Sequence, residues 1–140
     1  MSRLFKKGVL TLCTLIVGLA IGVFGSISAQ SEPVYELRTY KSTPGNLDNL
    51  QARFRDHTIR IFGNHGMEVV GFWVPTDEDS EDTLIYILRH ASREAADASW
   101  RAFGQDPEWQ RVAEESNRNG QILASVVREY MSATDYSPLK

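Results

Sequence analysis

The sequence has little cysteine and little histidine, and each scarcity excludes a class of function. The 140 residues contain one cysteine, Cys13, and three histidines, and the histidines lack the short spacings of a zinc site. Because Cys13 lies in a segment that we expect to be removed, the mature domain has no disulfide, no thiol nucleophile and no thiolate ligand. The sequence therefore predicts neither a metal site nor a cofactor.

Clustered positive charge is also scarce. Residues 30–140 hold 12 of the 15 Lys and Arg residues and all 18 Asp and Glu residues, which gives them a net charge of −6. A protein that binds nucleic acid needs grouped lysines and arginines that neutralise phosphates. We therefore expect this acidic domain to have no nucleic-acid partner.

Residues 1–29 have the three zones of a secretory signal peptide. Three basic residues come first, residues 9–24 are apolar and uncharged, and residues 25–29 are small and turn-prone. Cleavage near Ala29 would export the protein to the periplasm or the extracellular space. The alternative is an uncleaved membrane anchor in residues 9–28, because a spanning helix needs about 20 apolar residues and this stretch is marginally long enough. A membrane partner is expected only in that case.

Residues 30–140 form one domain in which strand and helix patterns alternate. Runs of aromatic and β-branched residues predict strands, and apolar residues spaced by three and four predict helices. The strands are expected at residues 34–41, 67–75, 83–89 and 125–131. The helices are expected at residues 44–64, 93–103 and 107–118, with caps at Thr43, Ser92 and Asp106 and a stop at Gly66. The order βαββαβ predicts an α+β ferredoxin-like sandwich, in which helices cover one face of a four-stranded antiparallel sheet.

The second and third predicted strands are apolar on both faces, which a sheet with one face in water is not. The large side chains are Val69, Val70, Phe72, Trp73 and Val74, followed by Leu84 to Leu88. Burying five or six of them is worth about 10 kcal/mol, so the face without helices needs a cover. We expect a homodimer that pairs the open sheet faces about a two-fold axis and closes a dimeric α+β barrel. The alternative is that loops or the C-terminal tail cover this face.

Several short motifs follow one another in an order that resembles the NIPSNAP family. They are Val34-Tyr35-Glu36-Leu37-Arg38-Thr39-Tyr40 with Pro44-Gly45, His65-Gly66-Met67 with Val70-Gly71-Phe72-Trp73, Ser92-Arg93-Glu94, Asp106-Pro107-Glu108-Trp109, and Thr134-Asp135-Tyr136-Ser137-Pro138. The resemblance implies a NIPSNAP-like ferredoxin-fold domain in residues 30–140 that assembles as a dimeric α+β barrel. It implies no reaction, although similar barrel groups include cofactor-independent oxygenases and haem enzymes.

His57 is the candidate catalytic residue. It has the helical spacing of Leu50, Phe54 and Ile61, so we expect its ring to point toward the sheet. There it would act as a general base or would orient a ligand. The alternative is an interior imidazole whose hydrogen bonds are simply satisfied.

The candidate ligand-binding residues lie mainly on the first and last strands. Glu36, Arg38 and Tyr40 share one face of the first strand by the period of two, and Arg128 lies on the last strand. With His57 and Tyr86 they form a set suited to orient a polar ligand. The alternative is a structural ion pair or an exposed sheet edge.

The other histidines and the tryptophans are expected to have structural roles. His65 is expected to close a helix, and His90 is expected to lie at the surface. Trp73, Trp100 and Trp109 are expected to anchor the core or an interface.

Two functions follow from these observations, and the sequence does not decide whether the protein is an enzyme. The first is an exported, dimeric module of the NIPSNAP type that binds a small molecule, such as a small apolar ligand, or a partner, with no assigned reaction. The second is a metal-free enzyme, oxygenase-like or isomerase-like, that acts on an apolar substrate between helix and sheet. The second predicts a closed pocket of about 300 Å³ with His57 or Tyr86 at its wall.

Overall fold

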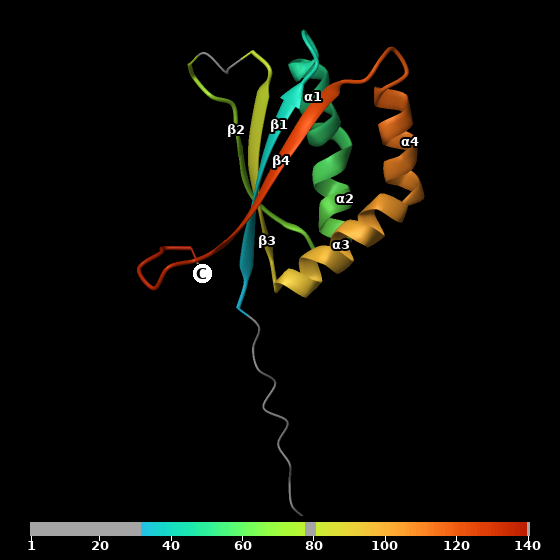
Figure 1. Cartoon of the computed structure of the whole chain (residues 1–140). Coiled ribbons are helices and arrows are strands. Elements are labelled where there is room, and N and C mark those ends of the chain that lie inside the picture. Colours follow the sequence, from blue (N-terminus) through green and yellow to red (C-terminus); the bar gives the residue numbers. More distant parts are fainter. Residues whose placement is uncertain (1–31, 78–80, 140) are drawn as a thin grey trace, which may run out of the picture.

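All the helices lie on one side of a four-stranded antiparallel sheet in the computed structural model, which describes residues 32–77 and 81–139 (Figure 1). The elements in chain order are β1 (Val34–Ser42), α1 (Leu47–Arg53), the π-helical turn η1 (Phe54–Thr58), α2 (Ile59–Asn64), β2 (Glu68–Trp73), β3 (Thr83–His90), α3 (Arg93–Gln105), α4 (Pro107–Ser116) and β4 (Leu123–Ser132). The sheet order is β2-β3-β1-β4, with every neighbouring pair antiparallel. The predicted α+β ferredoxin-like fold is therefore confirmed.

The N-terminal signal peptide or anchor predicted in residues 1–29 lies outside the described residues. Among the helices of the described part, none is long and apolar enough to cross a membrane.

The core fills the space between the sheet and the first helical region. Even-numbered residues of β3 point toward the helices and pack against Leu50, Phe54 and Phe62, all of which are almost completely buried. Tyr86 lies at the centre, with its ring centroid 5.2 Å from those of both Phe54 and Phe72. Burying each such side chain contributes about 1.5–3 kcal/mol, so this aromatic cluster is the main apolar support of the helix layer.

The first helical region contains a π-helical turn that the apolar spacing does not reveal. The Ile59 N–H group bonds to the Phe54 carbonyl, five residues earlier, and the Thr58 hydroxyl donates to the Arg53 carbonyl at 3.1 Å. The wider turn returns Thr58, instead of His57, to the buried face. The expectation that His57 points toward the sheet is therefore wrong, and its side chain is exposed.

The helix boundaries follow most of the predicted caps. The Ser92 hydroxyl accepts a hydrogen bond from the Ala95 N–H group at 3.1 Å, and Asp106 Oδ1 accepts one from the Glu108 N–H group at 2.7 Å. Gly66 takes a left-handed conformation after α2, with φ +71°, as predicted.

The predicted cap at Thr43 is wrong. Pro44 and Gly45 form a turn, and α1 begins three residues later than expected, at Leu47. The Thr43 hydroxyl instead donates to the Gln121 carbonyl at 2.7 Å. This bond ties the end of β1 to the segment that leads into β4.

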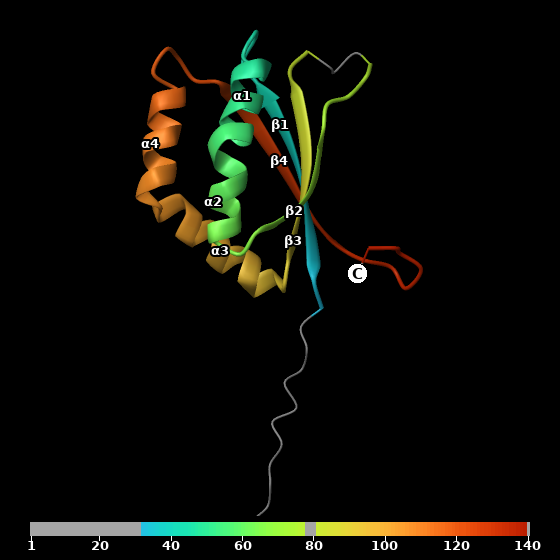
Figure 2. The ribbon, with the colours of Figure 1, turned by 180° about the vertical axis from the view of Figure 1, so that it is seen from behind.

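No helix of the described residues covers the opposite face of the sheet (Figures 1 and 2). Odd-numbered residues of β3, Ile85 and Ile87, are on this face, so the prediction that β3 is apolar on both sides is confirmed. Trp73 of β2 folds its ring over Gly71, where a Cβ atom would lie 2.8 Å from the ring. The side chain of Trp73 is nevertheless 49% exposed, and that of Val127 on β4 is 59% exposed.

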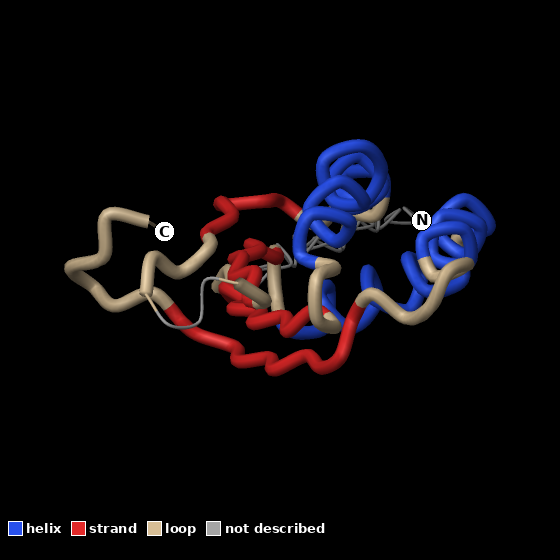
Figure 3. The backbone as a smooth tube through the Cα atoms, turned by 90° about the horizontal axis from the view of Figure 1, so that it is seen from above, coloured by secondary structure: helices blue, strands red, loops and turns tan. Residues whose placement is uncertain are grey.

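The C-terminal tail covers only one end of this open face. Seen from above, it leaves the sheet and loops away on the side opposite the helices (Figure 3). A hollow of about 270 Å³ separates its residues Thr134 and Leu139 from Tyr35, Ile87 and Met131. The described part of the chain leaves the middle of the open face uncovered. This face therefore exposes more large apolar side chains than the surface of a monomer usually does.

Two glycines at the end of α2 give a matched test of this geometry. Replacing Gly66 by Ala places a Cβ in the left-handed region and should lower the free energy of unfolding by about 1 kcal/mol. Replacing Gly63, which is helical and has open space around it, should raise the free energy of unfolding by about 0.5–1 kcal/mol. Urea denaturation of both variants measures the difference, and equal effects at the two positions would contradict the assigned backbone.

Candidate functional site

A buried carboxylate, Glu36, organises the polar part of the helix–sheet interface. Its side chain is 0% exposed, and its Oε1 atom accepts a hydrogen bond from Arg38 Nε at 2.7 Å and forms an ion pair with Arg38 Nη2, also at 2.7 Å. Its Oε2 atom accepts a hydrogen bond from Trp100 Nε1 at 2.6 Å and contacts His90 Nε2 at 2.8 Å. Since an ionised carboxylate can only accept, the histidine must donate from Nε2. The cluster ties β1, β3 and α3 together.

The cluster keeps Glu36 ionised. Burial alone raises the pKa of Glu36, but the hydrogen bonds from His90 and Trp100 and the charge of Arg38 outweigh burial, so its pKa lies below the ordinary value. The Arg38 guanidinium also stacks on Trp100, with its Cζ atom 3.9 Å from the ring centroid. Glu36 is therefore a fixed negative charge with four donors, which is a poor arrangement for a catalytic acid or base.

Tyr40 and Tyr86 form a second buried pair beside this cluster. The Tyr86 hydroxyl donates to the Tyr40 hydroxyl at 2.9 Å, and the two rings meet edge to face. Burial, followed by the effect of Tyr40, raises the pKa of Tyr86 well above its ordinary value. Tyr86 thus keeps its proton and acts as a hydrogen-bond donor inside the core.

Arg38 and Arg128 come together at the edge of the sheet. They are direct partners across β1 and β4, on the side that faces the helices. Both line an open recess of about 480 Å³, together with Val126 and Val127. Of the candidate ligand-binding residues, Arg38 and Arg128 are therefore neighbours on one surface. Glu36 and Tyr86 are buried and do not line the recess.

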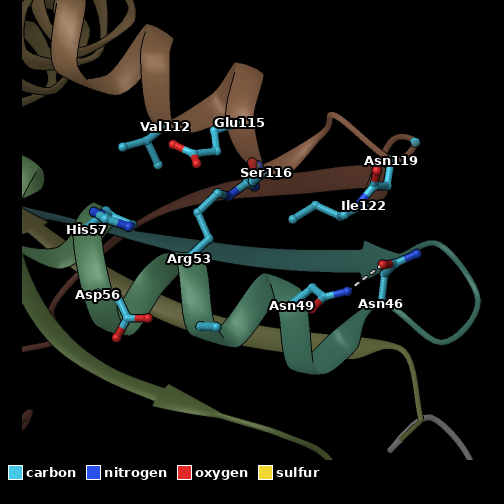
Figure 4. Close-up of a pocket in the computed structure, with 12 residues that line it drawn as sticks. Asn46, Asn49, Arg53, Asp56, His57, Val112, Glu115, Ser116, Asn119 and Ile122 are labelled. Atoms are coloured by element: carbon cyan, nitrogen blue, oxygen red, sulfur yellow. Dashed lines mark hydrogen bonds between the residues drawn. The ribbon is translucent and has the colours of Figure 1, made fainter.

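His57 lies elsewhere, on the rim of a polar cavity between the first helical region and α4 (Figure 4). The cavity has a volume of about 370 Å³. Its wall carries Arg53, Ser116 and several asparagines, and Figure 4 shows the Arg53 side chain reaching across toward Ser116. The six candidate residues therefore divide into a group on β1, β3 and β4 and the separate His57.

The interior beside Tyr86 is filled by side chains. Among the cavities found in the described residues, the one bounded by Phe54, Phe72 and Leu84 has a volume of about 170 Å³, and Tyr86 is not on its wall. This is smaller than the pocket of about 300 Å³ that an apolar substrate needs. Within the described ranges, no three His, Cys, Asp or Glu side chains are arranged to hold a metal ion.

Three important residues were not identified from the sequence. His90 is buried against Glu36, so the expectation that it lies at the surface is wrong. Trp100 was expected to be an apolar anchor, but its indole N–H group completes the carboxylate cluster. Arg53 was not a candidate, because a charged residue next to the apolar face of a helix normally faces water. The one available signal for His90 was its even-numbered position on β3, which puts it on the same face as Leu84, Tyr86 and Leu88.

The expected role of His65 is confirmed and extended. It follows α2 as its C-terminal cap residue, and its Nε2 atom lies 2.7 Å from Asp106 Oδ2. The hydrogen bond from His65 is the main reason that the pKa of Asp106 is lowered. The Asp106 carboxylate thus caps α4 with one oxygen and contacts His65 at the end of α2 with the other, which links the two helices.

The fold and this buried cluster define a ferredoxin-like α+β domain with its polar groups on the helix side of the sheet. The chain belongs to the NIPSNAP family, whose sequence profile matches residues 35–138. No curated protein matches it in a sequence comparison.

Solved structures share the fold at low sequence identity. A NIPSNAP family protein from Agrobacterium tumefaciens superposes with a TM-score of 0.69 at 19% identity, over 78% of this chain and 100% of that one. A NIPSNAP-like domain protein from Burkholderia xenovorans gives 0.66 at 17% identity, over 76% and 90%. SnoaB, a cofactor-independent oxygenase from Streptomyces nogalater, gives 0.51 at 14% identity, over 77% and 99%. These similarities concern the fold alone.

The Glu36 cluster generates a stability prediction. Changing Glu36 to Gln leaves Arg38 buried without its counter-charge and should lower the free energy of unfolding at pH 7 by about 3–5 kcal/mol. The matched control is Glu114→Gln, an exposed carboxylate on α4, which should change it by less than about 0.5 kcal/mol. Chemical denaturation followed by circular dichroism measures both, and similar values for the two variants would show that the cluster is not a structural requirement.

Proposed function

We propose that the protein is an exported, dimeric binding module for a small molecule that has an apolar body and an anionic group. The observation that carries this proposal is the pairing of Arg38 and Arg128 across β1 and β4, on the wall of one recess. Arg128 adds an exposed positive charge beside Arg38, whose own charge is paired with Glu36, on an otherwise acidic domain.

The donors of both arginines support an anionic ligand. Arg128 is exposed, and within residues 32–77 and 81–139 it forms no ion pair with a carboxylate. Arg38 uses Nε and Nη2 to hold Glu36, and its Nη1 group makes no hydrogen bond in the same ranges. The planar guanidinium fork matches a carboxylate group in geometry and charge. The ligand head group would therefore lie over β1 and β4.

The apolar part of the ligand is inferred from the other walls. Val126 and Val127 line the recess with side chains that are 40% and 59% exposed. Apolar walls with a few convergent polar groups are typical of small-molecule sites. The alternative function, a metal-free enzyme acting on an apolar substrate between helix and sheet, receives less support. The interior around Tyr86 is filled, and the cavity of about 370 Å³ that His57 lines is polar and lies between two helical regions.

The proposed assembly is a homodimer through the open face of the sheet. This face exposes Trp73 and Val127, and Ile85 and Ile87 lie between them on β3. A second copy placed face to face about a two-fold axis would bury this apolar surface and would close a barrel of two sheets. Because Val127 belongs both to this face and to the recess, dimer formation would also complete the ligand site.

A pair of adjacent substitutions tests the assembly. Val127→Glu places a charge on the open face and should raise the dimer dissociation constant at least about 100-fold, because an unpaired buried charge costs about 3–5 kcal/mol. Val126→Glu places the same charge on the helix side and should leave the dimer intact. Analytical ultracentrifugation distinguishes them. A wild-type protein that sediments as one chain at micromolar concentration would refute the dimer.

Octanoate is a suitable probe for the recess, with 1-octanol as its uncharged counterpart. Calorimetry should show saturable binding of octanoate, at least about tenfold weaker binding to Arg128→Gln, and little binding of the alcohol. The matched control is Arg101→Gln, an exposed arginine on α3 that lies outside the recess. Equal affinities of the wild type and Arg128→Gln would exclude the recess as the binding site.

The proposed export rests on the sequence pattern of residues 1–29 and has its own test. Expression in a secreting bacterium followed by intact-mass analysis should give a chain that begins at Ala29 or Gln30 in the soluble exported fraction. A full-length chain recovered in the membrane fraction would instead establish the anchored form. Full-length protein in the cytosolic fraction would contradict both.

A further inference from the structure

A second site, separate from the β1–β4 recess, lies between the first helical region and α4. At its centre is Arg53, the last residue of α1, which is only 7% exposed. Its Nη1 atom donates to the Ser116 hydroxyl at 3.2 Å, and its Cζ atom lies 5.3 Å from the centroid of the Trp109 ring. These two contacts hold the guanidinium across the gap between α1 and α4.

Arg53 has more donors than its contacts use. A guanidinium has five N–H groups, and the bond to Ser116 occupies one of them. Its Nε atom is buried and has no hydrogen-bond partner among the described residues. In those residues no carboxylate forms an ion pair with Arg53 either, and burial lowers its pKa. A buried cation with unused donors is costly unless something compensates the charge.

The side chain of Arg53 borders a cavity of suitable size. Arg53 lines the 370 Å³ cavity described above, and His57 and Asn119 also line it (Figure 4). The Asn46 and Asn49 side chains, joined by a hydrogen bond of 2.9 Å, stand at one end. Asparagine amides both donate and accept, so this end suits hydroxyl groups.

The carboxylates at the rim limit the charge of an occupant. Asp56 is exposed and points away from Arg53 (Figure 4). Glu115 lies on the cavity wall, and its Oε1 atom is 3.8 Å from Arg118 Nη2. A ligand with several negative charges would be repelled by these groups, whereas the hydroxyl groups of a singly charged molecule could donate to Glu115.

We infer that this cavity binds a small hydroxylated monocarboxylic acid, whose carboxylate pairs with Arg53 and whose hydroxyl groups reach the asparagines and Glu115. The π-helical turn η1 follows Arg53 directly, and its residues Asp56 and His57 line the cavity. Such turns occur frequently at functional sites, because they displace side chains from the regular helical positions.

Gluconate is the probe for this site, and glucose is the uncharged control with similar hydroxyl groups. Titration calorimetry with the full chain should show saturable binding of gluconate and little heat with glucose. Arg53→Gln should weaken gluconate binding at least about tenfold. Arg55→Gln removes an exposed arginine two residues away, outside the cavity, and should leave the affinity unchanged. The absence of saturable gluconate binding to the wild type would overturn the inference, as would unchanged binding to Arg53→Gln.

Because Arg53 also bridges two helices, a second pair of variants tests the inference without depending on the folding of Arg53→Gln. Glu115→Gln removes a negative charge from the wall but keeps a carbonyl oxygen that accepts from a ligand hydroxyl, so gluconate binding should tighten by about threefold to tenfold. Glu114→Gln removes the neighbouring exposed carboxylate, which is not on the wall, and should have little effect. Equal affinities of these two variants would contradict the inference. Neither pair alters Arg128, so a failed gluconate test leaves the octanoate test of the proposed function unaffected.

Discussion

The structure depends on one buried carboxylate at the interface between the sheet and α3. Glu36 is on the face of β1 that points into the helix layer, where an apolar side chain is the usual choice. The position is acceptable because three side chains from three elements, Arg38, His90 and Trp100, hold both carboxylate oxygens. Removing any of them leaves a buried charge or a buried donor without a partner, so these elements have to fold together. The cluster fixes how β1, β3 and α3 are aligned, and the aromatic core supplies the apolar stabilisation of the same interface.

Much of the fold could be predicted from the sequence because its signals are local. The strand runs, the caps at Ser92 and Asp106 and the left-handed Gly66 each depend on a few neighbouring residues, and the structure confirms them. The alternation of β1 correctly placed Glu36, Arg38 and Tyr40 on one face. The apolar residues on both sides of β3 were also read correctly, since a strand repeats every two residues regardless of its partners.

The rest of the site could not be predicted, because it depends on contacts between distant segments or on a change of helical period. The position of His57 was inferred from α-helical spacing, and a single π-helical turn left its side chain exposed. His90 is 54 residues from Glu36, and Trp100 is 64 residues away, so no local pattern connects them. Arg53 is buried only because α4 packs against α1, which brings Ser116 and Trp109 to it. Long side chains of this kind reveal their partners only in three dimensions.

The direct test of this account is the ionisation of Glu36 itself. Nuclear magnetic resonance of the side-chain carboxyl carbon, followed as the pH is lowered, reports the pKa of this group in the folded protein. Because four N–H groups hold the charged form against the cost of burial, the account predicts a midpoint below the ordinary value of 4.5. A midpoint above 4.5 would mean that burial dominates and that the cluster does not compensate the charge. That result would contradict the role assigned to Glu36 as the fixed centre of the helix–sheet interface.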